Sequence, residues 1–167
     1  RSRTEARMQS LVNNLVIEQC AEDLRQLSIP TFVSWRGREQ IAPAPNLHYL
    51  YTSYIKPHFN GDATGRLWEG ATVTFVAMQL AYFMGFKQAI LIGVDHNFST
   101  KGTPNTTIVS TGDDPNHFHP GYFGKGFRWQ LPDLETSEIA YRMAKQAYTS
   151  DGREILDATV GGKLTVF

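Results

Sequence analysis

Three short segments of the chain carry side chains that could bind a ligand or move a proton. The first is Asp95-His96-Asn97, which directly follows a continuously apolar run at residues 89–94. A carboxylate and an imidazole at the end of a strand offer a general base, a metal ligand or a hydrogen-bond clamp for hydroxyl groups. A plainer interpretation is an aspartate that caps the next loop beside an exposed histidine. Because the segment follows the most apolar strand, we expect Asp95 to face a ligand.

The second segment is Gly70-Ala71-Thr72-Val73-Thr74, which stands where a helix is predicted to begin. The first backbone N–H groups of a helix have no partner within it, and the helix dipole adds partial positive charge, so such a start can bind an anion. Thr72 or Thr74 could add a hydroxyl group. Equally, Thr72 could only cap the helix while Gly70 only turns the chain. The sequence alone favours neither interpretation.

The third segment covers residues 112–120 and combines two adjacent carboxylates with two histidines. Asp113 and Asp114, together with Asp95, are candidate ligands for a divalent cation. The spacing matches no standard zinc motif, and the Asp-Pro and His-Pro pairs also suit plain turns. His117 and His119 are better explained as catalytic or substrate-contacting residues than as metal ligands, because one imidazole suffices for proton transfer.

Aromatic side chains follow this segment closely. Tyr122, Phe123, Phe127 and Trp129 could stack on a flat or sugar-like ligand, or they could form a small satellite core under the loop. We include Tyr122 among the candidate ligand contacts. The sequence contains no Walker loop, nucleophile elbow or HExxH motif, so it gives no positive sign of nucleophilic hydrolase chemistry.

Hydrophobic periodicity predicts the elements that must position these residues. Helices are expected over residues 16–27, 71–84 and 134–148, with Asp133 as the cap of the last and Gly85 ending the second. Strands are expected over residues 31–35, 47–53, 89–94, 154–159 and 163–167. Loops are expected over residues 36–46, 56–69 and 97–132, of which the last two are long enough to be functional.

The run at residues 89–94 indicates how the sheet is built. A strand that is apolar on both sides is typical of a parallel sheet with helices on both faces. The chain is therefore predicted to be one α/β domain over residues 1–167, with a Rossmann-like, open and mostly parallel sheet. Ligands of such sheets bind outside the carboxyl ends of the strands, where the three segments are expected to converge.

Composition narrows the class of protein. Of the 167 residues, 41% are hydrophobic, and 16 basic residues balance 16 acidic ones, so we expect no broad nucleic-acid-binding surface. One cysteine, Cys20, excludes an intrachain disulfide and suits a reducing cytoplasm. No apolar run reaches the length of a membrane span, and the sequence begins without a signal-peptide pattern. A homo-oligomer is compatible with the sequence.

Several of these segments resemble a known family, the 6-hydroxymethylpterin diphosphokinase MptE-like domain. This domain also occurs in bacterial motility accessory factors and is similar to the core of certain bacterial sialyltransferases. The resemblance extends from about residue 13 onward and is carried by Gly70-Ala-Thr-Val-Thr, Ala81-Tyr-Phe-Met-Gly-Phe, Ile90-Leu-Ile-Gly-Val-Asp-His, Asp113-Asp-Pro-Asn-His-Phe-His-Pro-Gly-Tyr-Phe-Gly-Lys-Gly and Pro132-Asp-Leu-Glu.

The resemblance implies a Rossmann-like fold and transfer from a nucleotide-activated donor to a hydroxyl acceptor. In one branch of the family, diphosphate moves from ATP, with magnesium, to a pterin alcohol; in the others, a nonulosonic sugar moves from its CMP form. Carried onto this chain, the resemblance implies that the helix start at residues 70–74 and Asp95 contact the nucleotide, and that His117 or His119 is the base.

One departure from the family pattern is visible. Family members begin with a strand and a glycine-rich turn of the Gly-Asn-Gly-Pro-Ser type, and nothing similar precedes Asn13. We therefore expect the chain to match the C-terminal part of the family domain. Three functions stay open: a diphosphokinase-like transferase as the leading hypothesis, a CMP-sugar glycosyltransferase for surface polysaccharide or flagellin, and a non-catalytic ligand-binding module.

Overall fold

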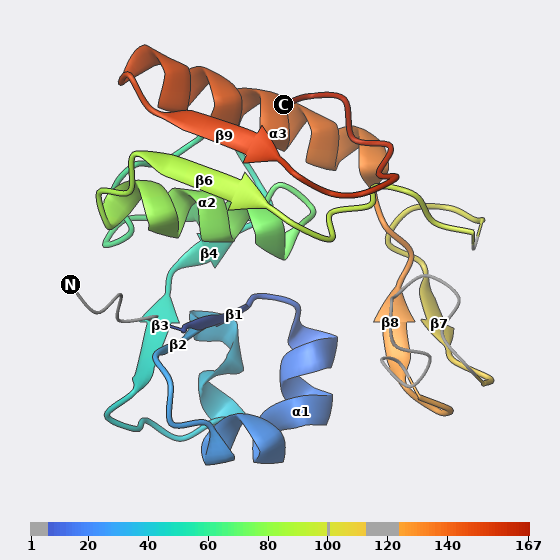
Figure 1. The fold of residues 1–167 in the computed structure, drawn as a ribbon. Helices are drawn as coiled ribbons and strands as arrows, with labels where there is room; N and C mark the ends of the chain where they lie inside the picture. The colour runs from blue at the N-terminus through green and yellow to red at the C-terminus, as the bar shows by residue number, and fades with distance from the viewer. Residues whose placement is uncertain (1–6, 100, 113–123) are drawn as a thin grey trace.

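The computed structural model describes residues 7–99, 101–112 and 124–167, which form an α/β arrangement of helices and mostly parallel strands (Figure 1). The helices are α1 (Asn14–Gln26), α2 (Val73–Phe83) and α3 (Leu134–Ser150), with a short 3-10 helix, η1 (Trp35–Glu39). The strands are β1 (Gln9–Leu11), β2 (Thr31–Ser34), β3 (Leu47–Leu50), β4 (Thr52–Ser53), β5 (Leu67–Trp68), β6 (Gln88–Leu91), β7 (Thr107–Val109), β8 (Arg128–Gln130) and β9 (Glu154–Asp157).

The N-terminal part is built on the parallel sheet β1-β2-β3. The central strand pairs Val33 with Leu11 on one side and with Tyr49 on the other. Helix α1 packs Ile17 and Leu24 against this sheet, and Ile41, which follows η1, joins the same core. Strands β4 and β5 form a separate parallel pair.

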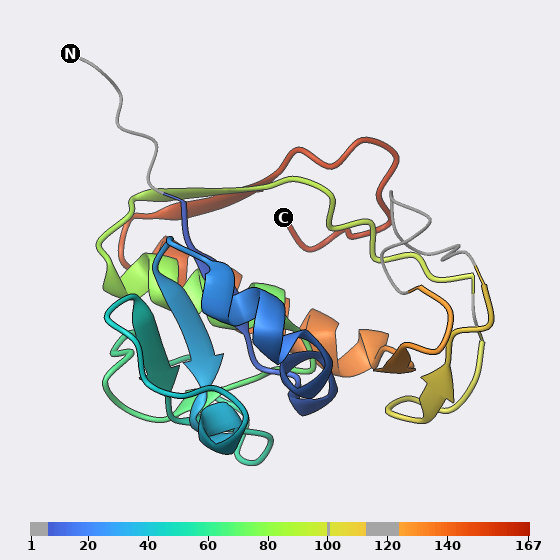
Figure 2. The ribbon, with the colours of Figure 1, turned by 90° about the horizontal axis from the view of Figure 1, so that it is seen from below.

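The C-terminal part pairs β6 with β9 in parallel and packs them on α2 and α3. The shared core includes Phe75 and Met78 from α2, Ala144 and Tyr148 from α3, and Leu91 from β6. Figure 2 shows β6 and β9 running side by side along one edge of the molecule. Strands β7 and β8 form an antiparallel pair beside the start of α3 (Figure 1).

Most of the predicted elements are confirmed. The three helices are present, Asp133 caps α3, and Gly85 ends α2 in a left-handed conformation with φ of 83°. The prediction of a strand at residues 163–167 is wrong, because this segment pairs with no neighbouring strand. Short strands that the periodicity missed lie in the predicted loops and near the N-terminus, and strands of two or three residues are too short to show a period.

The prediction that residues 89–94 are buried on both faces is also wrong. Leu91 packs on the helices, whereas Ile90 and Ile92 are 55% and 80% exposed. Helices α2 and α3 cover one face of the β6–β9 pair, and no element of the described chain covers the other. The described strands also pair as separate small sheets and do not form one open sheet.

None of the helices in the described ranges combines the length and apolar character that crossing a membrane requires.

Candidate functional site

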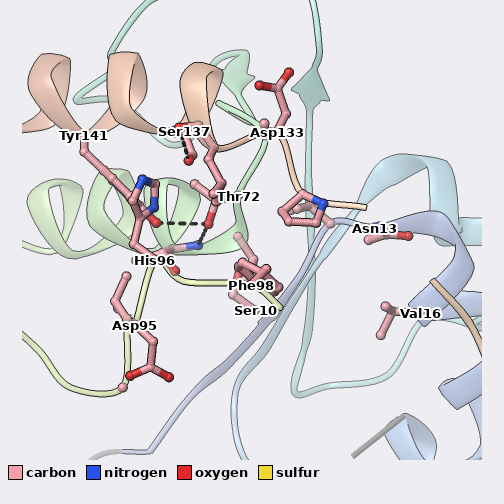
Figure 3. Close-up of a pocket in the computed structure, with 18 of the residues that line it drawn as sticks. Ser10, Asn13, Val16, Thr72, Asp95, His96, Phe98, Asp133, Ser137 and Tyr141 are labelled. Carbon is pink, nitrogen blue, oxygen red and sulfur yellow. Dashed lines mark hydrogen bonds between the residues drawn. The ribbon is translucent and has the colours of Figure 1, made fainter. Parts of the chain in front are cut away.

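A pocket of about 450 Å³ opens where the carboxyl ends of β1 and β6 meet the first turns of α1, α2 and α3 (Figure 3). We call it the carboxyl-end pocket. Its polar lining comes from four separate segments and includes Gln9, Ser10, Asn13, Thr72, Thr74, Asp95, His96, Asn97, Asp133, Ser137 and Tyr141. Its position agrees with the general rule that ligands of parallel sheets bind beyond the carboxyl ends of the strands.

The caps of all three helices line this pocket. Asn13 Oδ1 accepts a hydrogen bond from the Leu15 N–H at 2.9 Å, and Thr72 Oγ1 accepts one from the Thr74 N–H at 3.2 Å. Asp133 caps α3 in the same way. The first turns of α1 and α2 contain no acidic residue that would cancel the positive end of the helix dipole. The first turn of α3 contains Glu135, and its cap is the Asp133 carboxylate, so this start offsets part of its own dipole. The partial positive charge at the cavity therefore comes mainly from the starts of α1 and α2.

The turn that leads into α2 is strained and tightly packed. Gly70 and Ala71 have φ angles of 57° and 58°, in the left-handed region that disfavours side chains. A Cβ atom on Gly70 would lie 2.5 Å from the Ala140 Cβ atom, so only glycine fits against α3. His96, with φ of 50°, is also left-handed and, like Ala71, lines the pocket. Strain of this kind is retained where the surrounding structure enforces it, often at functional sites.

A buried ion pair fixes the chain just before this turn. Glu69 is 3% exposed and pairs with the guanidinium group of Arg36. Arg36 also lies over the ring of Tyr54, with 4.3 Å between its Cζ atom and the ring centroid, and it donates to the Val12 carbonyl at 3.4 Å. These contacts tie the ends of β1 and β2 to the segment that enters α2, so they support one wall of the pocket.

Two hydroxyl groups meet at the inner wall of the pocket. The Thr72 Oγ1 and Tyr141 Oη atoms lie 3.3 Å apart, and either could be the donor (Figure 3). Tyr141 is 3% exposed, and burial raises the pKa of its phenol above the usual range. Tyr141 therefore keeps its proton at neutral pH and offers the pocket a neutral hydrogen-bonding group without adding negative charge.

His96 lies beside Tyr141 and has a carboxylate partner. Its Nε2 atom is 3.2 Å from Glu138 Oε1, and its side chain is only 7% exposed. Glu138 also accepts a hydrogen bond from Arg142 at 2.9 Å, and the bonds from Arg142 and His96 lower the pKa of Glu138. An ionised Glu138 fixes the imidazole ring in the wall. The plainer interpretation of His96 as an exposed side chain is therefore wrong.

Asp95 lies at the rim of the same pocket. Its side chain is exposed and points away from Thr72, His96 and Tyr141 (Figure 3). Its backbone carbonyl accepts a hydrogen bond from the Lys163 N–H at 2.8 Å, which holds the end of β6 against the C-terminal segment. The described residues contain no group of three or more metal-ligating side chains.

The structure brings six of the twelve sequence-predicted site residues together. Those that line the pocket are Ala71, Thr72, Thr74, Asp95, His96 and Asn97. Gly70 is buried against α3 and shapes the turn instead of facing the cavity. Five predicted residues, Asp113, Asp114, His117, His119 and Tyr122, lie outside the described residues.

Sequence reasoning missed several pocket residues from other parts of the chain, namely Ser10, Asn13, Ser137 and Tyr141. Asn13 precedes an apolar helical pattern, so a cap was recognisable there. Nothing in the sequence indicated that the starts of α1 and α3 approach the start of α2. Asp133 was predicted as a cap, but not as part of a site.

The pocket differs from a typical phosphate site in one respect. Among the described residues, no lysine or arginine side chain lines it, and its carboxylates are those of Asp95 and Asp133. An anion bound here would depend on backbone N–H groups and hydroxyl groups. Comparisons of the chain with protein-family models, with curated proteins and with solved structures find no match.

Proposed function

We propose that this protein is a nucleotide-dependent transferase that binds the phosphates of its donor in the carboxyl-end pocket. The observation that carries the proposal is the convergence of three helix starts on one cavity. Each start has N–H groups without a partner in its own helix, and the dipoles of α1 and α2, whose first turns contain no acidic residue, favour a negative ligand. The sequence resemblance suggests the same class of activity and the same helix start at residues 70–74.

The arrangement of the strands in one sheet is part of the same proposal. In a Rossmann-like sheet, the phosphates lie at a helix start that follows a strand, outside the carboxyl ends of neighbouring strands. The start of α2 and the residues that follow β1 and β6 all line the pocket, which supports this arrangement. We propose that β1-β2-β3 and β6-β9 are two halves of one such sheet.

For the diphosphokinase-like reaction, the acceptor hydroxyl oxygen forms a bond to the β-phosphorus of ATP. The bond from that phosphorus to the α,β-bridging oxygen breaks, and AMP leaves with the electron pair. The backbone N–H group of Val73 would hold a phosphate oxygen, and Thr72 and Tyr141 would add hydroxyl donors.

The remaining roles are a base and a cation. Mg²⁺, with Asp95 as its protein ligand, would supply charge neutralisation when bound. The proton of the acceptor would pass to His117 or His119, as the family resemblance implies. His96, held by Glu138, would keep its ring in the wall and shape the cavity.

A second candidate, transfer of a sugar from a CMP-linked donor, is favoured by the lack of basic side chains in the described lining. A CMP-linked nonulosonic sugar carries one charge on its phosphodiester and one on its carboxylate, whereas the triphosphate of ATP concentrates several charges that N–H groups alone would neutralise poorly. The acceptor oxygen would attack the anomeric carbon, and CMP would leave. A binding module without turnover is the third candidate.

The test is thermal stabilisation of the chain by ATP with Mg²⁺, by CMP and by a CMP-linked nonulosonic sugar. A rise in Tm with ATP–Mg²⁺ alone supports the first candidate, and a rise with CMP and its sugar supports the second. Binding without product formation, measured by mass spectrometry with a hydroxymethyl acceptor, would leave only the binding module. No stabilisation by any of the three would contradict the assignment of the pocket.

One substitution tests the helix-start geometry directly. Val73 is the first residue of α2, and Thr72 before it has the extended backbone that a following proline requires. Val73→Pro therefore removes one N–H group and keeps the helix. We expect ligand affinity to fall by about tenfold, the value of one charge-assisted hydrogen bond. Val73→Ala, which keeps the N–H group, is the matched control and should bind as the wild type does.

A further inference from the structure

The two ring nitrogens of His96 have different surroundings. Nε2 lies 3.2 Å from Glu138 Oε1, its hydrogen-bond partner. Nδ1 has no hydrogen-bond partner among the described residues, and it is not one of their buried polar atoms that lack a partner. Because His96 lines the carboxyl-end pocket and only 7% of its side chain is exposed, Nδ1 is reached from that cavity.

The partner of Nε2 determines which nitrogen carries the hydrogen atom. The hydrogen bonds from Arg142 and His96 lower the pKa of Glu138, so its carboxylate is ionised at neutral pH and can only accept. A neutral imidazole has one donor nitrogen and one acceptor nitrogen. With Nε2–H directed to Glu138, Nδ1 keeps its lone pair and is a hydrogen-bond acceptor in the wall of the pocket.

This acceptor lies beside groups of the opposite kind. The rings of His96 and Tyr141 are neighbours, with 6.1 Å between their centroids, and the Tyr141 hydroxyl meets the Thr72 hydroxyl at the start of α2 (Figure 3). A phosphate oxygen can accept from these hydroxyls and from the Val73 N–H group, but it has no hydrogen atom to offer Nδ1. The inner wall therefore suits two unlike groups side by side, an anion and a group that donates a hydrogen bond.

The side chain of Asp95 does not compete for this acceptor, because it points away from His96, Thr72 and Tyr141 (Figure 3). In a nucleotide, the donor groups next to the phosphates are the ribose hydroxyls, whereas the amino groups of the base lie further along the ligand. With the phosphates at the start of α2, a ribose hydroxyl is thus the group that suits Nδ1.

We propose that His96 Nδ1 accepts a hydrogen bond from a ribose hydroxyl and makes the carboxyl-end pocket selective for ribonucleotides. The inference rests on the proposed function, and it applies to ATP and to CMP-linked donors alike because both carry a ribose. Glu138 acts as a positioning residue, since it holds the ring and keeps the hydrogen atom on Nε2.

Selectivity follows from the burial of His96. A site that hydrogen-bonds a hydroxyl group rejects the analogue without it, because a polar atom of the site is then left unpaired. A nucleotide without ribose hydroxyls would fill the cavity and cut Nδ1 off from water without giving it a partner. We therefore expect the 2′,3′-dideoxy form of a nucleotide to bind about tenfold more weakly than the ribose form.

The experiment is titration calorimetry of the chain with CMP and with ATP–Mg²⁺, each compared with its 2′,3′-dideoxy form. The measurements are made at about pH 8.5, where imidazole groups are ordinarily neutral. Equal affinities for the two forms would overturn the proposal and leave nucleotide binding, and with it the proposed function, in place. Binding of neither CMP nor ATP–Mg²⁺ would contradict both.

Two substitutions separate the roles of the ring nitrogens. His96→Gln places an amide near the position of Nε2, where it can donate to Glu138, and has no atom near Nδ1, so it should bind the two forms equally. His96→Asn places an amide oxygen near Nδ1 and suits the left-handed backbone with φ of 50°, so it should keep part of the preference. His48→Gln, at an exposed position of β3 outside the pocket lining, is the matched control and should keep all of it.

NMR of the ring nitrogens tests the inference without a ligand. A two-bond ¹H–¹⁵N correlation spectrum distinguishes the donor nitrogen of a neutral imidazole from the acceptor nitrogen, and we expect the hydrogen atom of His96 on Nε2. Circular dichroism confirms that each variant is folded. A hydrogen atom on Nδ1, or a preference for the ribose form that persists in His96→Gln, would overturn the proposal.

Discussion

Strands β2 and β6 differ in composition and in burial, and the two differences run in opposite directions. Two of the four residues of β2, Thr31 and Ser34, are polar, yet both are fully buried, as is Val33. Strand β6 begins the most apolar run of the chain, yet Ile90 and the following Ile92 are exposed. Strand β2 lies between β1 and β3, whereas β6 has one neighbour. Burial therefore follows the position in the sheet more closely than the side-chain type.

The polar residues of β2 are buried with their hydrogen bonds made. Ser34 Oγ and Thr52 Oγ1 lie 2.8 Å apart, and Thr31 Oγ1 donates to the Ile29 carbonyl at 3.0 Å. Buried hydroxyl groups that keep partners cost little. The exposed isoleucines near β6 have no such compensation, because apolar area that stays in water contributes nothing to stability. Strand β2, which has a neighbour on each edge, is thus well buried, whereas β6, which has one neighbour, keeps apolar side chains in water.

The largest expected effect contrasts the same change at the two strands. Val33→Asp places an unpaired charge in the core of the first sheet and should lower the free energy of unfolding by about 5 kcal/mol. Ile92→Asp exposes the same group to water and should change that free energy by less than about 0.5 kcal/mol. Guanidinium titration followed by circular dichroism measures both. Equal losses of unfolding free energy for the two variants would mean that Ile92 is covered in solution. The contrast between β2 and β6 would then be wrong.

The second prediction applies the contrast to the two sides of α2. Phe75 is fully buried in the C-terminal core, and Phe75→Ala should cost about 4 kcal/mol by loss of transfer free energy and creation of a cavity. Val73, on the opposite side of α2, is 41% exposed, and Val73→Ala should change stability by less than about 0.5 kcal/mol. Thermal unfolding of the two variants measures both losses of stability. A large loss for Val73→Ala would show that this side of α2 is covered in solution.

The third prediction concerns the covered face of the β6–β9 pair. Tyr148 is fully buried and donates to the Met78 carbonyl at 2.8 Å, so Tyr148→Phe should cost about 1 kcal/mol at neutral pH. Burial raises the pKa of Tyr148 to about 12. Its neutral form therefore adds stability below its ordinary pKa of about 10, and this contribution is lost as the pH rises through about 12.

Chemical denaturation at several alkaline pH values checks the third prediction. The wild type should lose stability between pH 10 and 12 more steeply than Tyr148→Phe does. Parallel curves for the two proteins would show that the Tyr148 phenol is accessible to solvent. Helix α3 would then pack less tightly on the β6–β9 pair than the structure indicates. Tyr51, which is exposed, supplies the matched control as Tyr51→Phe.

The smallest expected effect concerns Glu138 on α3, which pairs with His96 in the loop after β6. The hydrogen bonds from Arg142 and His96 lower the pKa of Glu138, so its ionised form stabilises the fold above the ordinary glutamate pKa of about 4.3. That contribution disappears as the pH falls through the lowered value. Glu138→Gln should therefore be slightly less stable than the wild type at pH 7 and equal to it in strong acid. A difference that stays constant with pH would indicate lost packing and not a lost charge.

Much of the local structure could be predicted from the sequence. Helical spacing of apolar residues located α1, α2 and α3, and cap chemistry placed Asp133 at the start of α3 and Gly85 at the end of α2. Strand β5 and the pair β7–β8 could not be predicted, because such brief strands form only when a distant partner segment is present.

The candidate site was predictable only in part. Asp95 and His96 after β6, and Thr72 before α2, could be predicted as site residues because the strand and helix signals lie next to them in the sequence. Ser10, Asn13 and Tyr141 join them across large sequence separations, and one sequence carries no local sign of such proximity. The direction of the Asp95 side chain, away from the inner wall, was likewise beyond sequence reasoning.

The sequence by itself determined the three helices and the longer strands, because backbone propensity, apolar period and caps act over a few residues. Only the tertiary structure decided that three helix starts share one pocket and that the apolar run after α2 stays open on one side. The physical reason is that the burial of a side chain and the meeting of distant segments at one site both depend on which other elements lie nearby. A side chain is covered only when another element lies against it, and that element can come from anywhere in the chain or from another polypeptide.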